Sequence, residues 1–256
     1  IDSATGDLAY FQGMSVGPVG GAPDVSALDP VDPTMSRDRS RFAFVTRDRT
    51  AVHVAGTDGS LREAMRGTGL TSPSIDGLGW VWAADGAETS RVRAVPAEPG
   101  QEARIVTATW LRPAERIVDL RVSRSGARAA LLVDDGDRRT VRVAGIVRGS
   151  DGVPSALTEP ILLPSTGRAA SVEWAGDTNL LVSPRAATPD ERVVPRIVSI
   201  DGTVRELNPL GGLTGVSTGD GGALYAETDE LVFLLVGSSW RAQELERGVR
   251  DLSFPG

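Results

Sequence analysis

The chain has 256 residues, a formal net charge of −7 and no cysteine, and its length suits one large all-β domain or two small ones. The acidic balance argues against a protein that binds nucleic acid or an anionic membrane, and the lack of cysteine excludes a disulfide framework and a thiolate site. No apolar run approaches the roughly 18 residues of a membrane span and no stretch resembles a signal peptide, so we expect no membrane insertion by this chain and any export signal upstream of Ile1.

Residues 1–33 contain two short β-prone pieces, at 8–11 and 14–16, followed by a Gly- and Pro-rich linker. The Tyr-Phe-Gln-Gly tetrapeptide at 10–13 is similar to a protease-cleavage tag, so residues 1–13 are expected to be either a tag remnant or native sequence. We predict that the two β-prone pieces are strands that help to close a larger fold.

From residue 34 onwards, a unit of short strands and turns repeats five times. Many of its turns carry Asp-Gly pairs, as at Asp58 and Asp201, because these residues tolerate the positive φ that short turns require. Corresponding points recur about every 40–50 residues, which is the spacing of four-stranded propeller blades. The predicted blades span residues 34–66, 70–108, 117–164, 169–209 and 213–247.

The third unit opens with the clearest hairpin of the chain, at residues 117–133. Apolar and polar residues alternate up to Ser123, a tight turn follows, and a β-prone apolar run completes the pair. The pattern Ser-Arg-x-x-x-Arg-x-Ala-aliphatic that begins at Ser123 also begins at Ser36 in the first unit. The shared turn pattern favours a structural repeat.

Residues 249–254 look like one more inner strand without partners of its own. Because the strands near residues 8–16 also lack partners, both ends are expected to combine into a sixth, composite blade that hides the edge strands. The predicted fold is therefore all-β: a single β-propeller domain over residues 1–256 with about six four-stranded blades. A pair of two-sheet sandwiches is the alternative, because it also needs many short strands.

Few side chains are candidates for catalysis or metal binding. The single histidine, His53, lies in an apolar strand and no Gly-x-Ser-x-Gly elbow is present, so we interpret His53 as structural. The acidic run at Asp134, Asp135 and Asp137 lacks the carboxylate that completes a calcium loop, because the twelfth position is Gly145. We expect no catalytic residue, no metal and no cofactor, and any small-molecule ligand stays unknown. Paired carboxylates from different blades stay open, because sequence spacing does not reveal their geometry.

Trp110 lies between two units and is the candidate anchor of a protein interface. With ordinary blade connectivity, the loops at 47–49, 134–139 and 184–192 share its face of the ring, which is rich in arginine and carboxylate. Such a rim around an aromatic suits protein recognition. The predicted partner-binding residues are Trp110, Arg112, Arg138, Arg139, Arg185 and Arg192.

The Ser-Arg-x-x-x-Arg-x-Ala patterns, the Ala-, Arg- and Val-rich units and the terminal Asp-Leu-Ser-Phe-Pro-Gly at 251–256 resemble the C-terminal propeller domain of the actinobacterial lipoprotein LpqB. The resemblance implies a protein anchored to the outer face of the cytoplasmic membrane through an upstream lipidated segment that this chain lacks, with a GerMN-type domain before the propeller. It also implies a link to the sensor kinase MtrB of a two-component system that controls the cell envelope. It provides no catalytic residues.

Two functions follow as hypotheses. The first is a non-enzymatic, extracytoplasmic interaction domain that modulates signalling or envelope processes. The second is a propeller hydrolase or lyase that acts on cell-wall glycans or peptides, since propellers host both kinds of protein. An enzyme is expected to gather carboxylates at the centre of the ring, one of them with a raised pKa, and a binder to expose an apolar patch on one face. A structural spacer is a third possibility.

Overall fold

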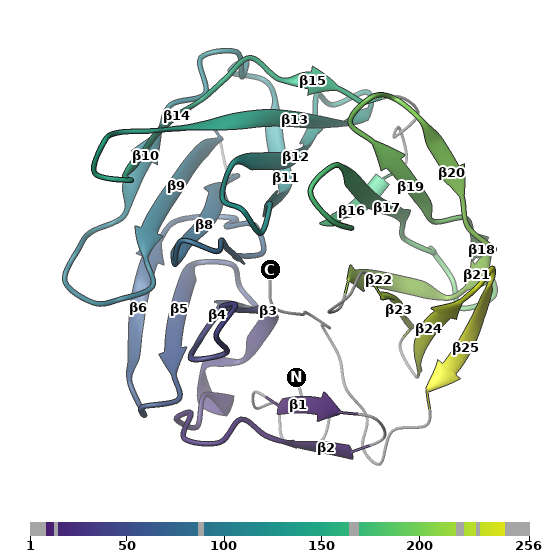
Figure 1. The fold of residues 1–256 in the computed structure, drawn as a ribbon, viewed down its shortest axis with the longest axis horizontal. Helices are drawn as coiled ribbons and strands as arrows, with labels where there is room; N and C mark the ends of the chain where they lie inside the picture. The colour runs from purple at the N-terminus through teal and green to yellow at the C-terminus, as the bar shows by residue number, and fades with distance from the viewer. Residues whose placement is uncertain are drawn as a thin grey trace.

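The computed structural model describes residues 9–12, 15–86, 90–163, 169–218, 223–228 and 231–243. Apart from one short 3₁₀ helix, η1 (Ser26–Leu28), the regular structure in these ranges is β-strand. Five sheets, each built on four antiparallel strands, are arranged in a ring around a common centre (Figure 1). This ring confirms the predicted all-β propeller.

The strands of each blade follow one another in chain order, from the centre of the ring outwards. Blade 1 comprises β3 (Pro30–Met35), β4 (Arg41–Thr46), β5 (Ala51–Gly56) and β6 (Leu61–Arg66). Blade 2 comprises β7 (Ser74–Ile75), β8 (Trp80–Asp85), β9 (Arg91–Pro96) and β10 (Arg104–Val106). Blade 3 comprises β11 (Arg116–Val122), β12 (Arg128–Asp134), β13 (Arg139–Arg148) and β14 (Pro154–Leu157), with β15 (Ile161–Leu162) also paired to β13.

Blade 4 comprises β16 (Ala169–Trp174), β17 (Asn179–Pro184), β19 (Arg196–Ser199) and β20 (Val204–Glu206). Blade 5 comprises β22 (Leu213–Thr218), β23 (Leu224–Thr228), β24 (Val232–Val236) and β25 (Ser239–Gln243). A separate two-stranded sheet joins β18 (Arg192–Val193) to β21 (Leu210–Gly211). In the chain, β18 lies between two strands of blade 4, and β21 lies in the connection from blade 4 to blade 5.

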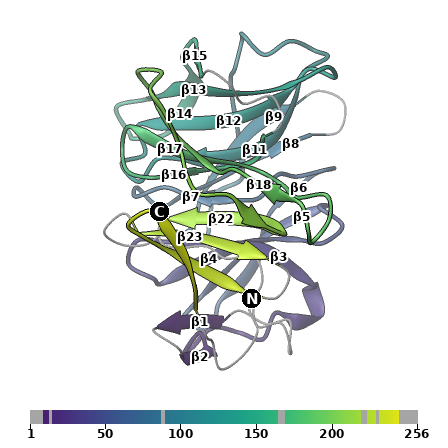
Figure 2. The same ribbon diagram turned by 90° about the vertical axis from the view of Figure 1, so that its right-hand side faces the viewer.

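A two-stranded hairpin, β1 (Ala9–Gln12) and β2 (Ser15–Pro18), lies next to blades 1 and 5, where the ring of four-stranded sheets is open (Figures 1 and 2). Its position is that of a partial sixth blade. The final inner strand predicted at residues 249–254 lies outside the described residues. The first inner strand, β3, begins at Pro30, inside the Gly- and Pro-rich stretch that was predicted to be a linker.

The hydrophobic core lies between neighbouring blades, because the middle strands are covered on both faces. Adjacent residues of one strand therefore belong to different core clusters: Leu131 packs between blades 2 and 3, and Leu132 packs between blades 3 and 4. Trp82 and Val81 of β8 divide in the same way between the two sides of blade 2. Burial on both faces explains why these strands are continuous apolar runs.

The repeated serine motif closes the same turn in two blades. The backbone N–H of Ser36 donates to the carbonyl of Arg41, and the N–H of Arg41 donates back to Oγ of Ser36 at 2.9 Å. Ser123 and Arg128 make the same two bonds in blade 3, with Oγ at 3.0 Å. The serine and the second arginine of the motif therefore form a pair of hydrogen bonds that joins the inner strand of a blade to its second strand.

Candidate functional site

The predicted partner-binding residues lie on one face of the ring. In blade 3, Arg116 at the start of β11 pairs with Asp134 at the end of β12. The linker that enters β11 therefore lies at the same end of the blade as the turn between β12 and β13. In antiparallel blades of identical order, equivalent ends share a face of the ring. The linker carries Trp110 and Arg112, and the turn carries Arg138 and Arg139.

Blade 4 presents its arginines at the equivalent end. Ala169 at the start of β16 pairs with Pro184 at the end of β17, so the chain leaves β17 on the face just described. Arg185 follows immediately and is exposed, and Arg192 is exposed at the start of β18. The structure thus brings the six residues to one face, in two groups on neighbouring blades.

Trp110 is partly buried and packs against the core between blades 2 and 3. The guanidinium of Arg142 lies over the indole ring, 5.6 Å from its centroid, at a distance typical of a cation–π contact. The same guanidinium donates to the buried carboxylate of Glu115 at 2.6 and 3.0 Å. Glu115 also accepts the backbone N–H of Arg112 at 2.9 Å, so the linker is held rigidly against the blade while the Arg112 side chain stays exposed.

The side chains of the two arginines in the β12–β13 turn differ in how strongly they are held by neighbouring residues. Arg139 donates to Asp134 at 3.1 Å and to the carbonyl of Ala169 in the next blade at 3.4 Å. Arg138 is exposed and lies 3.7 Å from Asp135, at the long end of an ion pair. Surface pairs of this kind contribute little to stability, so Arg138 is available to a partner at small cost.

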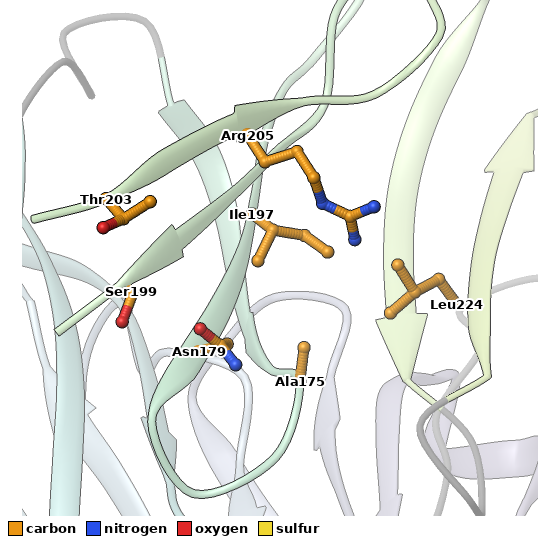
Figure 3. A pocket seen from close by; sticks show the side chains of 7 residues that line it. All are labelled: Ala175, Asn179, Ile197, Ser199, Thr203, Arg205 and Leu224. Carbon is orange, nitrogen blue, oxygen red and sulfur yellow. The ribbon is translucent and has the colours of Figure 1, made fainter. Parts of the chain in front are cut away.

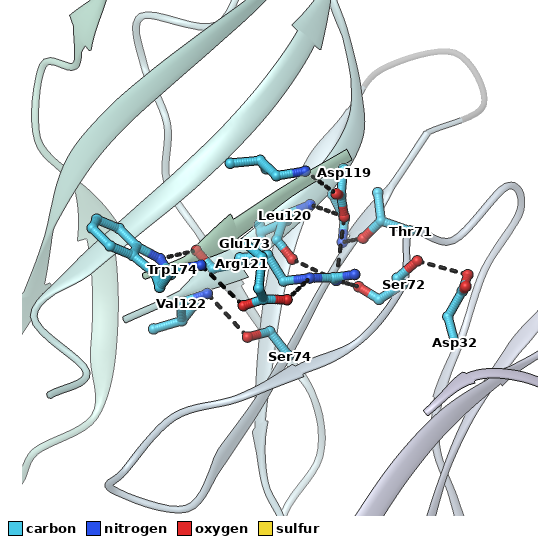
Figure 4. Close-up of polar contacts among 12 residues, drawn as sticks. Asp32, Thr71, Ser72, Ser74, Asp119, Leu120, Arg121, Val122, Glu173 and Trp174 are labelled. Carbon is cyan, nitrogen blue, oxygen red and sulfur yellow. Dashed lines mark hydrogen bonds and ion pairs between the residues drawn. The ribbon is translucent and has the colours of Figure 1, made fainter. Parts of the chain in front are cut away.

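A second group of polar residues, which was not predicted from the sequence, lies on the innermost strands of the ring (Figure 4). Arg121 of β11 is at its centre. Nε of Arg121 donates to Glu173 of β16 at 3.0 Å, and Nη1 lies 3.2 Å from Asp119. Asp119 also accepts the backbone N–H groups of Leu120 and Val172. These contacts join blade 3 to blade 4 beside the centre of the ring.

The same network reaches blades 2 and 1. Nη1 of Arg121 donates to the carbonyl of Ser72 at 3.4 Å, and the Ser72 hydroxyl donates to Asp32 of β3 at 2.7 Å. Asp32 is also paired with Arg49 at 2.5 Å. The inner strands of four successive blades are therefore linked by polar side chains as well as by apolar packing.

Burial and charge set the protonation behaviour of this network. Burial raises the pKa of Asp119 and of Glu173, and the positive charge of Arg121 opposes that rise in both carboxyls. For Asp32, burial alone would raise the pKa, but the Arg49 charge and the Ser72 hydrogen bond outweigh it and hold the pKa below its ordinary value. Each carboxylate is occupied by an arginine and by a backbone or hydroxyl donor, which is the arrangement of a structural clamp.

The single histidine lies on β5 as predicted, where its ring stacks on Phe44 of β4 at a centroid distance of 5.4 Å. Burial lowers the pKa of His53. Among the described residues, no group of three or more histidine or acidic side chains is placed to hold a metal ion. The described ranges also contain no helix long and apolar enough to cross a membrane.

The fold is similar to solved propellers of low sequence identity. TolB from Acinetobacter baumannii has 16% identity and a TM-score of 0.62, over 88% of this chain and 56% of TolB. Hydrazine synthase from Kuenenia stuttgartiensis has 13% identity and a TM-score of 0.57, over 83% of this chain and 64% of that one. The chain thus spans only about half the length of this TolB, and at such identities the likeness shows the fold alone.

No curated protein matches the chain significantly. A family model does: residues 6–255 match the lipoprotein LpqB beta-propeller domain. The match includes the Tyr-Phe-Gln-Gly tetrapeptide at 10–13, which is similar to a cleavage tag. Because it covers nearly the whole sequence and agrees with the ring of blades, the chain belongs to the LpqB β-propeller domain family.

Proposed function

We propose that this domain is a non-enzymatic protein-interaction module of an extracytoplasmic lipoprotein, anchored through an upstream lipidated segment. Its proposed role is to modulate a two-component sensor kinase and cell-envelope processes, with the extracytoplasmic part of MtrB as the partner that the family resemblance suggests. Membership of a lipoprotein family supports the extracytoplasmic setting. The interaction itself rests on the face that carries Trp110 and the five arginines.

The observation that carries this proposal is the ordered linker around Trp110, which precedes β11. Arg142 and Glu115 fix the linker against the blade, so that the exposed Arg112 projects from an ordered backbone. An ordered arginine loses less conformational freedom on binding than one on a mobile loop. Arginine is also enriched in protein interfaces, where its planar guanidinium makes paired hydrogen bonds to carboxylates.

The test is a direct binding measurement between the 256-residue chain and the purified extracytoplasmic region of the sensor kinase. Because Trp110 packs against the core, its truncation would also disturb the fold, so the sharper variant reverses two exposed charges, Arg112→Glu with Arg138→Glu. We expect at least a tenfold loss of affinity. Arg241→Glu, which reverses one exposed charge on the outer strand of blade 5, is the control and should bind as the unchanged chain does.

Two results contradict the proposal in different ways. An equal loss with the Arg241→Glu control means that general charge, not this face, governs binding. No binding by the unchanged chain at micromolar concentrations removes the kinase as the partner.

The hydrolase or lyase hypothesis has one observation in its favour, the raised pKa of Asp119 and of Glu173 at the innermost strands. Against it, the backbone N–H of Trp174 donates to Oε1 of Glu173 and the side-chain Nε of Arg121 donates to Oε2, so both carboxylate oxygens are engaged in structural hydrogen bonds. Turnover of cell-wall glycan or peptide by the chain, abolished by Glu173→Gln in a folded variant, would establish the enzyme instead.

A further inference from the structure

A cavity of about 370 Å³, open to solvent, lies between blade 4 and blade 5 near the outer part of their interface (Figure 3). The cavity continues outward from the apolar cluster that fills the inner part, in which Leu181 packs against Leu224. The register of blade 4 explains why packing stops here. Asn179 pairs with Ser199, and Ile197 pairs with Arg205, so polar side chains replace apolar ones on the same face of the sheet.

Two side chains that can donate hydrogen bonds line the cavity. Within the described part of the chain, the guanidinium of Arg205 and the side-chain amide of Asn179 have no hydrogen bond or ion pair, although both line the cavity. Arg196, the neighbour of Ile197 on the opposite face, is by contrast paired with Glu206 at 2.9 Å. A guanidinium that faces a cavity without a partner is a donor suited to a carboxylate, and a side-chain amide can either donate or accept a hydrogen bond.

The opposite end of the cavity offers acceptors. The Ser199 hydroxyl donates to the carbonyl of Thr178 at 3.4 Å, and the backbone N–H of Thr203 donates to Asp201 at 2.9 Å. The hydroxyl oxygens of Ser199 and Thr203 retain lone pairs that can accept a hydrogen bond, as does the amide oxygen of Asn179, which pairs with Ser199 across the strands. In Figure 3 these hydroxyls lie at the far side of the cavity from the guanidinium of Arg205, with Ile197 between them.

Part of the wall is aliphatic: Ile197 lies between the two polar groups, and Leu224 of blade 5 lies across from the guanidinium of Arg205. We infer that this cavity binds an aliphatic α-amino-acid carboxylate, either a free amino acid or the C-terminal residue of a peptide. The carboxylate contacts Arg205, the N–H group faces the side-chain oxygens of the row formed by Asn179, Ser199 and Thr203, and the side chain packs on Ile197 and Leu224. The volume, at the small end for ligand sites, fits a single residue of this kind.

The inference is independent of the proposed kinase interaction, and its test uses the whole chain with defined probes. Backbone and side-chain amide NMR spectra are recorded during titration with leucine, N-acetyl-leucine and N-acetyl-leucinamide, each up to about 10 mM, well above the millimolar dissociation constant expected for so small a ligand. We expect saturable shifts at Asn179 and Leu224 with a carboxylate probe and none with the uncharged amide. Binding of N-acetyl-leucine identifies a peptide end, and binding of leucine alone identifies the free amino acid.

The decisive variant is Arg205→Gln, which should weaken carboxylate binding at least tenfold. Arg196→Gln is its control, because it removes the same charge from the opposite face of the same strand pair. Binding within twofold of the unchanged chain is expected for this control. The inference is overturned by equal shifts with carboxylate and amide, by unchanged binding in Arg205→Gln, or by no saturable shift with any probe while the spectrum is that of a folded chain.

Discussion

Nε of Arg121 lies 3.0 Å from the carboxylate of Glu173, and this contact crosses from the inner strand of one blade to the inner strand of the next. The indole N–H of Trp174 crosses in the other direction and donates to the carbonyl of Arg121 at 3.0 Å. Two adjacent residues of β16 are therefore tied to one residue of β11. Apolar packing between blades resists separation but tolerates sliding, whereas these directional bonds fix the register of one blade on the other.

We predict that Arg121→Met destabilises the chain by about 3–5 kcal/mol, because it leaves the buried carboxylates of Asp119 and Glu173 without their shared cation. The loss should depend on pH. Burial raises the pKa of both carboxyls, and without Arg121 the rise is larger. A carboxyl whose pKa is raised in the folded state stabilises the fold at pH values below its unfolded-state pKa, which is near 4. This stabilisation is lost as the pH rises through the folded-state pKa.

Urea unfolding at pH 5 and pH 8 measures this effect, and the deficit of Arg121→Met should be greater at pH 8. Arg128→Met is the control, since this arginine donates to a carbonyl in blade 4 at an exposed position and holds no buried carboxylate. A deficit that is equal at the two pH values would show that lost packing, not unpaired charge, dominates.

Asp76 is a further buried carboxylate, and its removal should be costly. It is inaccessible to solvent and accepts hydrogen bonds from the backbone N–H of Trp80, the indole of Trp82 and the guanidinium of Arg148. We predict that Asp76→Asn lowers the free energy of unfolding by about 2–4 kcal/mol, because the amide turns an N–H toward existing donors. Asp58→Asn in an exposed turn should cost less than about 1 kcal/mol.

Thermal unfolding of both variants at neutral pH provides the comparison. The prediction for Asp76 is refuted by equal melting temperatures of Asp76→Asn and Asp58→Asn.

His53 should make the stability of the chain depend on pH. Burial lowers its pKa in the folded state, and the charge of Glu63 opposes that shift while Arg66 adds to it. Below about pH 6.5 the unfolded chain takes up a proton at this residue before the folded chain does, so stability falls as pH falls through this window. We expect the difference in unfolding free energy between the unchanged chain and His53→Gln to shrink from pH 8 to pH 5.5, and a constant difference would contradict the assignment.

The repeat and the blades were predictable because they rest on local signals. Strand alternation and turn residues locate β4 and β12, and the serine motif marks an actual pair of hydrogen bonds at Ser36 and at Ser123. In blade 2 the side chain of Asp76 takes the place of serine, with the N–H of Trp80 at 2.9 Å, which the serine pattern alone does not reveal. The blades therefore share a type of turn, in which a side-chain oxygen accepts a backbone N–H of the next strand, and not one fixed sequence.

The inner strand β3 and the Arg121 network were not predictable from local pattern. Pro30 and Pro33 give the stretch the composition of a linker, yet pairing with β4 makes it a strand, with an irregularity between Val31 and Thr34. Arg121 and Glu173 are 52 residues apart in the chain, and only the register between blades brings them together. The cavity beside Arg205 depends on an interface between blades in the same way.

The closing strand predicted at residues 249–254 remains a prediction. The hairpin β1–β2 could pair with such a strand, because in the described part of the chain this two-stranded sheet beside blade 1 has an unpaired edge. If Val249, Leu252 and Phe254 are buried in a composite blade, deletion of residues 249–256 removes roughly 5 kcal/mol of apolar burial. The melting temperature should then fall by about 10–20 °C, whereas deletion of Pro255 and Gly256 alone should leave it nearly unchanged. Calorimetry of the two truncations decides the matter: equal melting temperatures would mean that the ring closes without this strand, through the hairpin and the contacts between blades alone.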